Sequence, residues 1–243
     1  MKHLKKFFGM MALLLAISCT KSHTEGSGQV TFVLDSNLEI ADQTKSSLSQ
    51  YTTLPDSQDF IITITDASSA SVWSGKIADW DPATLLKAGQ YTVSASYGSV
   101  ENEGFGKPCF AGSADFVIVD EQITEVEVEV NLANTIVLVS CTDNFKSYYD
   151  SYSFKLTRDG SEIVSFAKDD ERAAFVDGYK VTFSGNIMKG GKTMTFTKDY
   201  NNLKAATAYT MLIDAANVGN STITVTFNDT VETIELGDIE LND

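Results

Sequence analysis

The sequence predicts an all-β protein built as two tandem immunoglobulin-like β-sandwich domains. Three observations support this prediction. About fourteen short segments alternate apolar and polar residues, which is the period of a half-buried strand. Helical periodicity is almost absent from the 243 residues. Turn-forming residues separate the segments at short intervals, as they do in β-sandwiches.

The first 18 residues read as a signal peptide rather than as part of the fold. Three lysines precede the apolar run Phe7–Ile17, and the small residue Ser18 stands directly before Cys19. A run of about 11 apolar residues is too short to span a bilayer as a helix. No later apolar stretch is long enough either.

The end of this segment resembles a bacterial lipobox, with Ala16 where leucine is usual. The resemblance implies a diacylglycerol on the Cys19 sulfur and cleavage just before it. The chain would then consist of a lipoprotein signal peptide (residues 1–18), a lipidated tether (19–27) and the folded part. The alternative is an ordinary secreted protein.

Five segments form the first group of expected strands. In the clearest of them, valines at 126, 128 and 130 alternate with glutamates, which predicts a half-buried strand with an acidic outer face. The expected strands are Gln29–Leu34, Phe60–Thr65, Tyr91–Tyr97, Ala114–Val119 and Thr124–Leu132. The N-terminal β-sandwich is therefore expected over residues 28–132.

The pattern restarts near Ala133 without a linker, which places the C-terminal β-sandwich at residues 133–243 and predicts a stiff pair. Asp-Gly at 159–160 and 177–178, and Gly190-Gly191, predict hairpin turns. The expected strands are Thr135–Cys141, Tyr152–Arg158, Glu162–Phe166, Ala173–Val176, Lys180–Ile187, Thr193–Lys198, Thr207–Asp214, Thr222–Asn228 and Thr230–Leu236.

One short helix carries both start and stop signals. Asp81 suits the N-cap, Pro82 the first helical position and Gly89 the residue past the end, which predicts about two turns. The segment Leu203–Ala216 is ambiguous because its alanines favour a helix, but its larger apolar residues alternate, so we expect a strand.

Composition restricts the function more than it defines it. The chain has 18 basic and 33 acidic residues, and without residues 1–18 the remaining 15 and 33 give a net charge of −18. That charge disfavours nucleic acid and anionic lipid as partners. The two histidines, His3 and His23, both lie outside the expected domains. Histidine-dependent catalysis and histidine-bearing zinc sites are therefore excluded there.

Three segments carry a resemblance to a known family: Leu86–Gly98, Lys107–Gly112 and Asn131–Asn134. Together with the lipobox, they are similar to the Bacteroidales lipoproteins of domain-of-unknown-function family 4493. The resemblance implies an envelope location, a β-rich fold and association with carbohydrate-related or adhesive proteins, and it supplies no catalytic residue. Cys109 stands where other members often have an aromatic residue.

A broader resemblance is to fimbrillin-type lipoproteins, which also place two β-sandwiches behind a lipobox. Many of these mature by cleavage after an arginine near the start of the first domain. The two arginines here, Arg158 and Arg172, both lie in the second domain. That maturation route is therefore closed to this chain, which disfavours the role of a processed pilus subunit.

The candidate ligand-binding residues are aromatic. Tyr148, Tyr149 and Tyr152 cluster near polar residues before a strand, and Trp80 stands beside the expected helix. Flat rings on a loop could stack on sugars, whereas packing into the core is the alternative. Thr230 follows Asp229 in a short pattern that resembles an O-glycosylation site of envelope proteins. No metal site is expected, because the acidic residues 169–171 lack the spacing of a calcium loop.

The sequence therefore predicts a non-catalytic, lipid-anchored protein of the outer membrane, with the leaflet left open. Its partners would be the membrane, through the lipid on Cys19, and a glycan or a surface protein. The alternatives are an accessory or anchor subunit of a fimbria-like assembly, joined by strand addition, and a glycosidase that uses carboxylates alone. No cofactor is expected.

Overall fold

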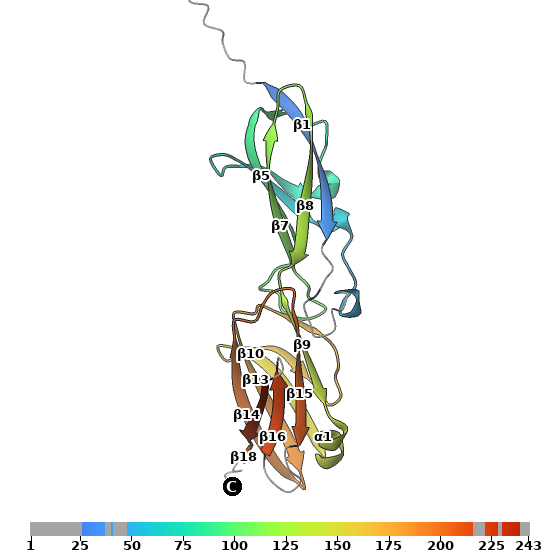
Figure 1. Cartoon of the computed structure of the whole chain (residues 1–243), viewed down its shortest axis with the longest axis vertical. Helices are drawn as coiled ribbons and strands as arrows, with labels where there is room; N and C mark the ends of the chain where they lie inside the picture. The colour runs from blue at the N-terminus through green and yellow to red at the C-terminus, as the bar shows by residue number, and fades with distance from the viewer. Residues whose placement is uncertain (1–25, 37–39, 41–47, 216–221, 228–229, 239–243) are drawn as a thin grey trace, which may run out of the picture.

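The computed structural model describes residues 26–36, 40, 48–215, 222–227 and 230–238. Figure 1 shows an elongated molecule in which two groups of strands follow each other along the long axis. Each group has its own hydrophobic cluster. The described residues form three β-sheets, which confirms the all-β class. The division into two immunoglobulin-like sandwiches stays a prediction.

A single seven-stranded sheet forms the N-terminal group, in the order β3-β2-β5-β7-β8-β1-β4. Its strands are β1 (Ser27–Ser36), β2 (Ile61–Asp66), β3 (Ser71–Lys76), β4 (Leu86–Lys87), β5 (Gly89–Tyr97), β7 (Phe110–Ile118) and β8 (Ile123–Leu132). Three short 3-10 helices accompany it: η1 (Leu48–Gln50), η2 (Ser57–Asp59) and η3 (Ile77–Asp79).

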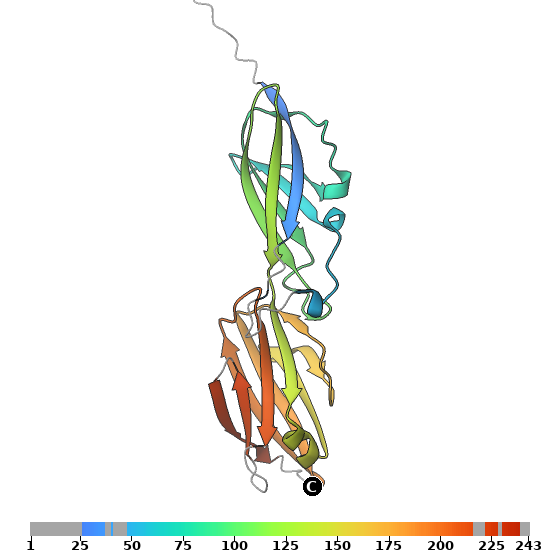
Figure 2. The ribbon, with the colours of Figure 1, turned by 45° about the vertical axis from the view of Figure 1, so that its right-hand side comes forward.

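Two sheets form the C-terminal group (Figure 2). The five-stranded sheet contains β11 (Ser161–Phe166), β10 (Ser151–Arg158), β13 (Lys180–Lys189), β14 (Lys192–Asn201) and β18 (Gly237–Asp238). The six-stranded sheet contains β17 (Thr230–Glu235), β16 (Thr222–Phe227), β15 (Ala208–Ala215), β9 (Thr135–Cys141), β12 (Ala174–Val176) and β6 (Gly104–Phe105). The helix α1 (Asp143–Tyr148) follows β9.

Strand alternation decides which residues reach the cores. In β8, the valines at 126, 128 and 130 are buried while the glutamates between them are exposed, as the sequence predicts. Along its length β8 pairs in parallel with β1. Position 185 of β13 has room only for glycine. A Cβ there would lie 2.8 Å from the ring of Phe154 and 2.4 Å from the ring of Phe196.

Two of the three predicted hairpin turns have the expected backbone. Asp159 and Gly160 have φ of 47° and 84°, and Gly190 and Gly191 have φ of 57° and 80°. Consecutive positive φ values are the signature of a type I′ turn. Gly178 does not have positive φ; a Cβ there would meet the carbonyl oxygen of Leu203 at 2.1 Å. Glycine is required at position 178 because the backbone of Leu203 passes too close to leave room for a side chain.

The predicted helix at Asp81–Gly89 is wrong. The Asp81 carboxylate accepts a hydrogen bond from the Ala83 amide at 2.9 Å, but the chain makes only a turn. Leu86 then pairs with Gly28 of β1 and is buried, so sheet pairing replaces the helix. The ambiguous segment Leu203–Ala216 contains strand β15, as expected.

The two groups share packing at their junction. β6 precedes the predicted boundary at residue 132 but pairs with β12 of the C-terminal group. Phe175 of β12 and its partner Ile136 of β9 belong to the N-terminal cluster, while the neighbouring Ala174 and Val137 belong to the C-terminal cluster. These strands are buried on both faces because each face meets a different core.

An ion pair also crosses the junction. Glu103, just before β6, pairs with Arg158 at the end of β10, and the two side chains are 11% and 25% exposed. Glu103 also accepts a hydrogen bond from the Asp177 amide at 2.6 Å. Arg158 in turn donates to the carbonyl oxygens of Lys180 and Asp177. The loop before β6 therefore fastens the two groups together.

Candidate functional site

The predicted tyrosine cluster lies around α1, at the end of the molecule far from the start of β1 (Figure 1). Thr142 is the N-cap of α1, and its hydroxyl accepts a hydrogen bond from the Phe145 amide at 3.2 Å. The same hydroxyl donates to Asp214 on β15. Phe145 is fully buried. Capping and burial together fix the position of this short helix.

Two of the three tyrosines belong to the C-terminal core. Tyr149 and Tyr152 are 3% and 4% exposed, and their ring centroids lie 4.7 and 5.0 Å from that of Phe145. Desolvation raises the pKa of both hydroxyls. A sugar can stack only on an accessible ring face, so these two residues pack rather than present a platform.

Tyr148 keeps a half-buried ring at the surface. The ammonium of Lys189 lies 4.7 Å from its centroid, and Lys189 also pairs with Asp150 at 3.7 Å. Asp150 accepts a hydrogen bond from the Gly190 amide at 2.7 Å. The β13–β14 hairpin and the end of α1 thus place one aromatic, one cationic and one anionic group together. Sequence reasoning missed Lys189, although the Gly190-Gly191 turn signal directly follows it.

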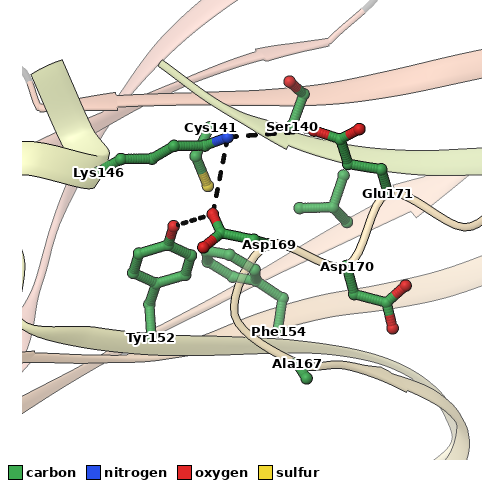
Figure 3. Close-up of a pocket in the computed structure, with 10 residues that line it drawn as sticks. Ser140, Cys141, Lys146, Tyr152, Phe154, Ala167, Asp169, Asp170 and Glu171 are labelled. Carbon is green, nitrogen blue, oxygen red and sulfur yellow. Dashed lines mark hydrogen bonds and ion pairs between the residues drawn. The ribbon is translucent and has the colours of Figure 1, made fainter. Parts of the chain in front are cut away.

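A second feature of this end is a small pocket, lined by both polar and apolar side chains of β9, α1, β10 and residues 167–171 (Figure 3). The Tyr152 hydroxyl donates to Asp169 at 2.7 Å, and the Lys146 ammonium lies 3.6 Å from Asp169 and 4.0 Å from Glu171. The Tyr152 hydrogen bond and then the Lys146 charge lower the pKa of Asp169. Burial raises the pKa of Cys141, on the pocket wall, to about 12.

This pocket does not suit glycoside hydrolysis. Its free volume of about 10 Å³ is the room that one water molecule needs. A glycosidase acid needs a raised pKa, whereas the pKa is lowered at Asp169 by Tyr152 and at Asp170 mainly by its hydrogen bond from Arg172. Among the described residues, no three or more His, Cys, Asp or Glu side chains are grouped so that they could hold a metal ion.

Trp80, the other predicted ligand-binding residue, lies in the N-terminal core. Its side chain is 9% exposed, and its indole N–H donates to the Val30 carbonyl at 3.0 Å. The Trp80 ring also packs edge-on against Phe32 and Trp73. The Trp80 ring therefore closes a core and is not exposed as a platform.

Two predicted modification sites fall where the structure says little. Cys19 lies outside the described residues. Thr230 begins β17, and its side chain lies outside the described part as well.

Cys109 and Cys141, the cysteines of the folded part, are both free thiols. In the described part of the chain, no helix is long and apolar enough to cross a membrane.

The structure is thus that of an all-β protein with three sheets in its described part. Tyr148, Asp150 and Lys189 give one end of it an aromatic and charged surface. The chain belongs to the family described as domain of unknown function (DUF4493), whose family model matches residues 26–243. The recognised resemblance to that family is thus confirmed. A search of curated proteins finds no match for this chain.

Two solved structures illustrate the wider similarity. The fimbrial anchor protein Mfa2 from Porphyromonas gingivalis is 12% identical, with a TM-score of 0.47, and the match covers 84% of this chain and 98% of that one. A fimbrial assembly protein from Parabacteroides distasonis is 8% identical, with a TM-score of 0.46, covering 87% and 97%.

Proposed function

We propose that this protein is a non-catalytic, lipid-anchored protein of the cell envelope that binds a glycan or a surface protein. The lipid on Cys19 would hold the end at which β1 begins close to the membrane. The surface formed by Tyr148, Asp150 and Lys189 would face away from it, and we name this surface the distal patch. The observation that carries the proposal is that β1 starts at one end of the molecule and α1 lies at the other (Figures 1 and 2).

The chemistry of the distal patch favours a glycan as its ligand. The accessible part of the Tyr148 ring can stack on a sugar face, while the Lys189 ammonium and the Asp150 carboxylate can bond hydroxyls. The neighbouring pocket is too small to admit a sugar ring. Binding would therefore occur on the open surface. The Glu103–Arg158 pair supports the proposal, because it joins the two groups of strands at their junction.

The test is a glycan array probed with full-length protein and with a Tyr148→Ala variant. The matched control is Tyr179→Ala, which removes a ring that is 75% exposed and lies on the β12–β13 turn, away from the distal patch. We expect a glycan signal that Tyr148→Ala loses and Tyr179→Ala keeps. An array without signal would overturn the glycan form of the proposal. Membrane fractionation of Cys19→Ser tests the anchor separately.

A second candidate is an accessory or anchor subunit of a fimbria-like assembly. The observation that favours it is the edge of β1: within the described residues, β4 covers that edge only at Ser27 and Gly28. An apolar pocket of about 50 Å³, lined partly by Leu34, Phe60 and Val130, adjoins the far end of β1. An open edge beside an apolar pocket can accept an added strand.

Sedimentation velocity over a range of concentrations tests this second candidate. Strand addition predicts assemblies that grow with concentration and that a proline within Gln29–Leu34 prevents, because proline removes a backbone donor and distorts the strand. A wild-type protein that stays monomeric at every concentration would contradict it.

A further inference from the structure

Four exposed aliphatic side chains occupy the end of the molecule at which the described chain begins. Val119 and Ile123 flank the β7–β8 turn and are 44% and 69% exposed. Val117 precedes them on β7 and is 51% exposed, while Ile118 beside it is buried. Leu85, just before β4, is 65% exposed. We name Leu85, Val117, Val119 and Ile123 the tether-end patch.

The start of β1 is fastened to the same turn. The Ser27 amide donates to the Asp120 carboxylate and the Glu121 amide donates to the Ser27 carbonyl, both at 2.9 Å. A Cβ on Gly28 would lie 2.4 Å from the Val119 carbonyl oxygen, so only glycine allows this approach. The chain therefore leaves the fold at a fixed point within the tether-end patch.

The distance from this point to Cys19 is short. Six residues lie between Cys19 and Gly26, so seven Cα–Cα steps join the two. A fully extended chain of that length spans about 25 Å, and a flexible one about 15 Å on average. A lipid on Cys19 would thus hold the patch close to the membrane surface, where a tether of this length gives an effective concentration in the millimolar range.

We propose that the tether-end patch rests on the lipid surface and so orients the molecule; this inference depends on the lipid anchor proposed above. Exposed aliphatic side chains gain free energy when they leave water for the acyl-chain boundary. Glu121 and Glu125 lie exposed beside the patch, so an electrically neutral lipid surface suits it better than an anionic one. The contact would supplement the acyl chains and hold the distal patch away from the bilayer.

Fluorescence quenching by lipids with brominated acyl chains tests the contact. Full-length lipidated protein is placed in phosphatidylcholine vesicles as wild type, as Ile123→Trp and as Ile61→Trp. Ile61 is the matched control because it is 40% exposed and lies at the opposite end of the same sheet, beside Ser96 at the end of β5. We expect the added fluorescence of Ile123→Trp to shift to the blue and to be quenched, and that of Ile61→Trp to be unaffected.

Vesicle flotation separates this proposal from the anchor on which it depends. If wild-type protein does not float with vesicles, or if Cys19→Ser floats equally well, the lipid anchor fails. If wild-type protein floats but Ile123→Trp is not quenched, the anchor stands and the tether-end contact is overturned. Equal quenching of Ile61→Trp would also overturn it, because the molecule would then lie flat.

The lipid composition provides one further comparison. Replacing part of the phosphatidylcholine with phosphatidylglycerol adds negative charge to the vesicle surface. We expect weaker quenching of Ile123→Trp at low ionic strength, and recovery on adding salt, which screens the repulsion. Stronger quenching on anionic vesicles would contradict the role assigned to the glutamates.

Discussion

The two groups of strands enclose their cores in different ways. The C-terminal cluster lies between two sheets, and both contribute its aromatic and aliphatic residues. The N-terminal cluster has a single hydrogen-bonded sheet, and irregular segments complete it: Phe60 follows η2, Trp80 follows η3, and both side chains are buried. A core between two sheets depends mainly on strand alternation, whereas the N-terminal core also depends on loops that must fold correctly.

The two cores are also joined rather than merely adjacent. Ile136 and Phe175 lie on strands of the C-terminal group but pack into the N-terminal cluster. The boundary between the two cores therefore runs through β9 and β12. How strongly the two cores depend on each other can be measured by substitutions in each core and at their junction.

Phe183→Ala should have the largest effect. Phe183 is fully buried, and its ring lies 5.6 Å from that of Phe154 and 5.5 Å from that of Phe196. Removing a buried phenylalanine ring leaves a cavity and lowers the free energy of unfolding by about 3–5 kcal/mol. Chemical denaturation measures the loss, and amide hydrogen exchange measures where protection falls.

The strands that lose protection against hydrogen exchange in Phe183→Ala show whether the two cores unfold separately. We expect faster exchange in β10, β13 and β14, and little change in β2 and β5. The reciprocal variant, Ile64→Ala in the N-terminal core, should show the opposite distribution. Equal loss of protection in both groups would mean that the two cores unfold as one unit.

Glu103→Gln should have an intermediate effect. The change removes the charge that Arg158 and the Asp177 amide contact, and hydrogen bonds to a charged group contribute about 1.5–3 kcal/mol. Because the pair joins the two groups, calorimetry should show their thermal transitions moving apart.

The surface pair Lys76–Asp59 provides the control for this variant. Its two side chains are 52% and 53% exposed, so Lys76→Gln should leave the calorimetric profile unchanged. A Glu103→Gln profile identical to the wild type would show that packing at β9 and β12 alone couples the groups.

The pH dependence at Cys141 should have no effect near neutral pH, because it appears only above pH 9.0. Burial raises the pKa of this thiol from 9.0 to about 12. Between those values the unfolded chain releases the proton and the folded chain keeps it, so the free energy of unfolding falls as the pH rises. The contribution is complete below pH 9.0 and is lost by about pH 12.

Chemical denaturation of wild type and Cys141→Ala across this range isolates the thiol, because other groups titrate equally in both proteins. We expect the difference in stability between them to shrink as the pH rises. A difference that does not change with pH would contradict the raised pKa.

Much of the strand content could be predicted because it depends on neighbours along the chain. The alternation in β8 and the positive-φ pairs at 159–160 and 190–191 are local properties, and they appear where expected. The helix predicted at Asp81 failed because its cap forms but Leu86 gains more by pairing with β1. A pairing partner more than fifty residues away leaves no local signal.

The candidate sites, too, have some features that the sequence shows and others that only the fold shows. Tyr148, Tyr149 and Tyr152 look equivalent in the sequence, yet the structure buries the last two and leaves Tyr148 at the surface beside Lys189. The tether-end patch and the Glu103–Arg158 pair join segments that are far apart along the chain. The sequence alone determined the all-β class, most strands and the family, because alternation, turn chemistry and short motifs are local. The tertiary structure alone decided which rings are accessible, where the cores meet and which residues share an end, because burial and proximity depend on the packing of distant strands.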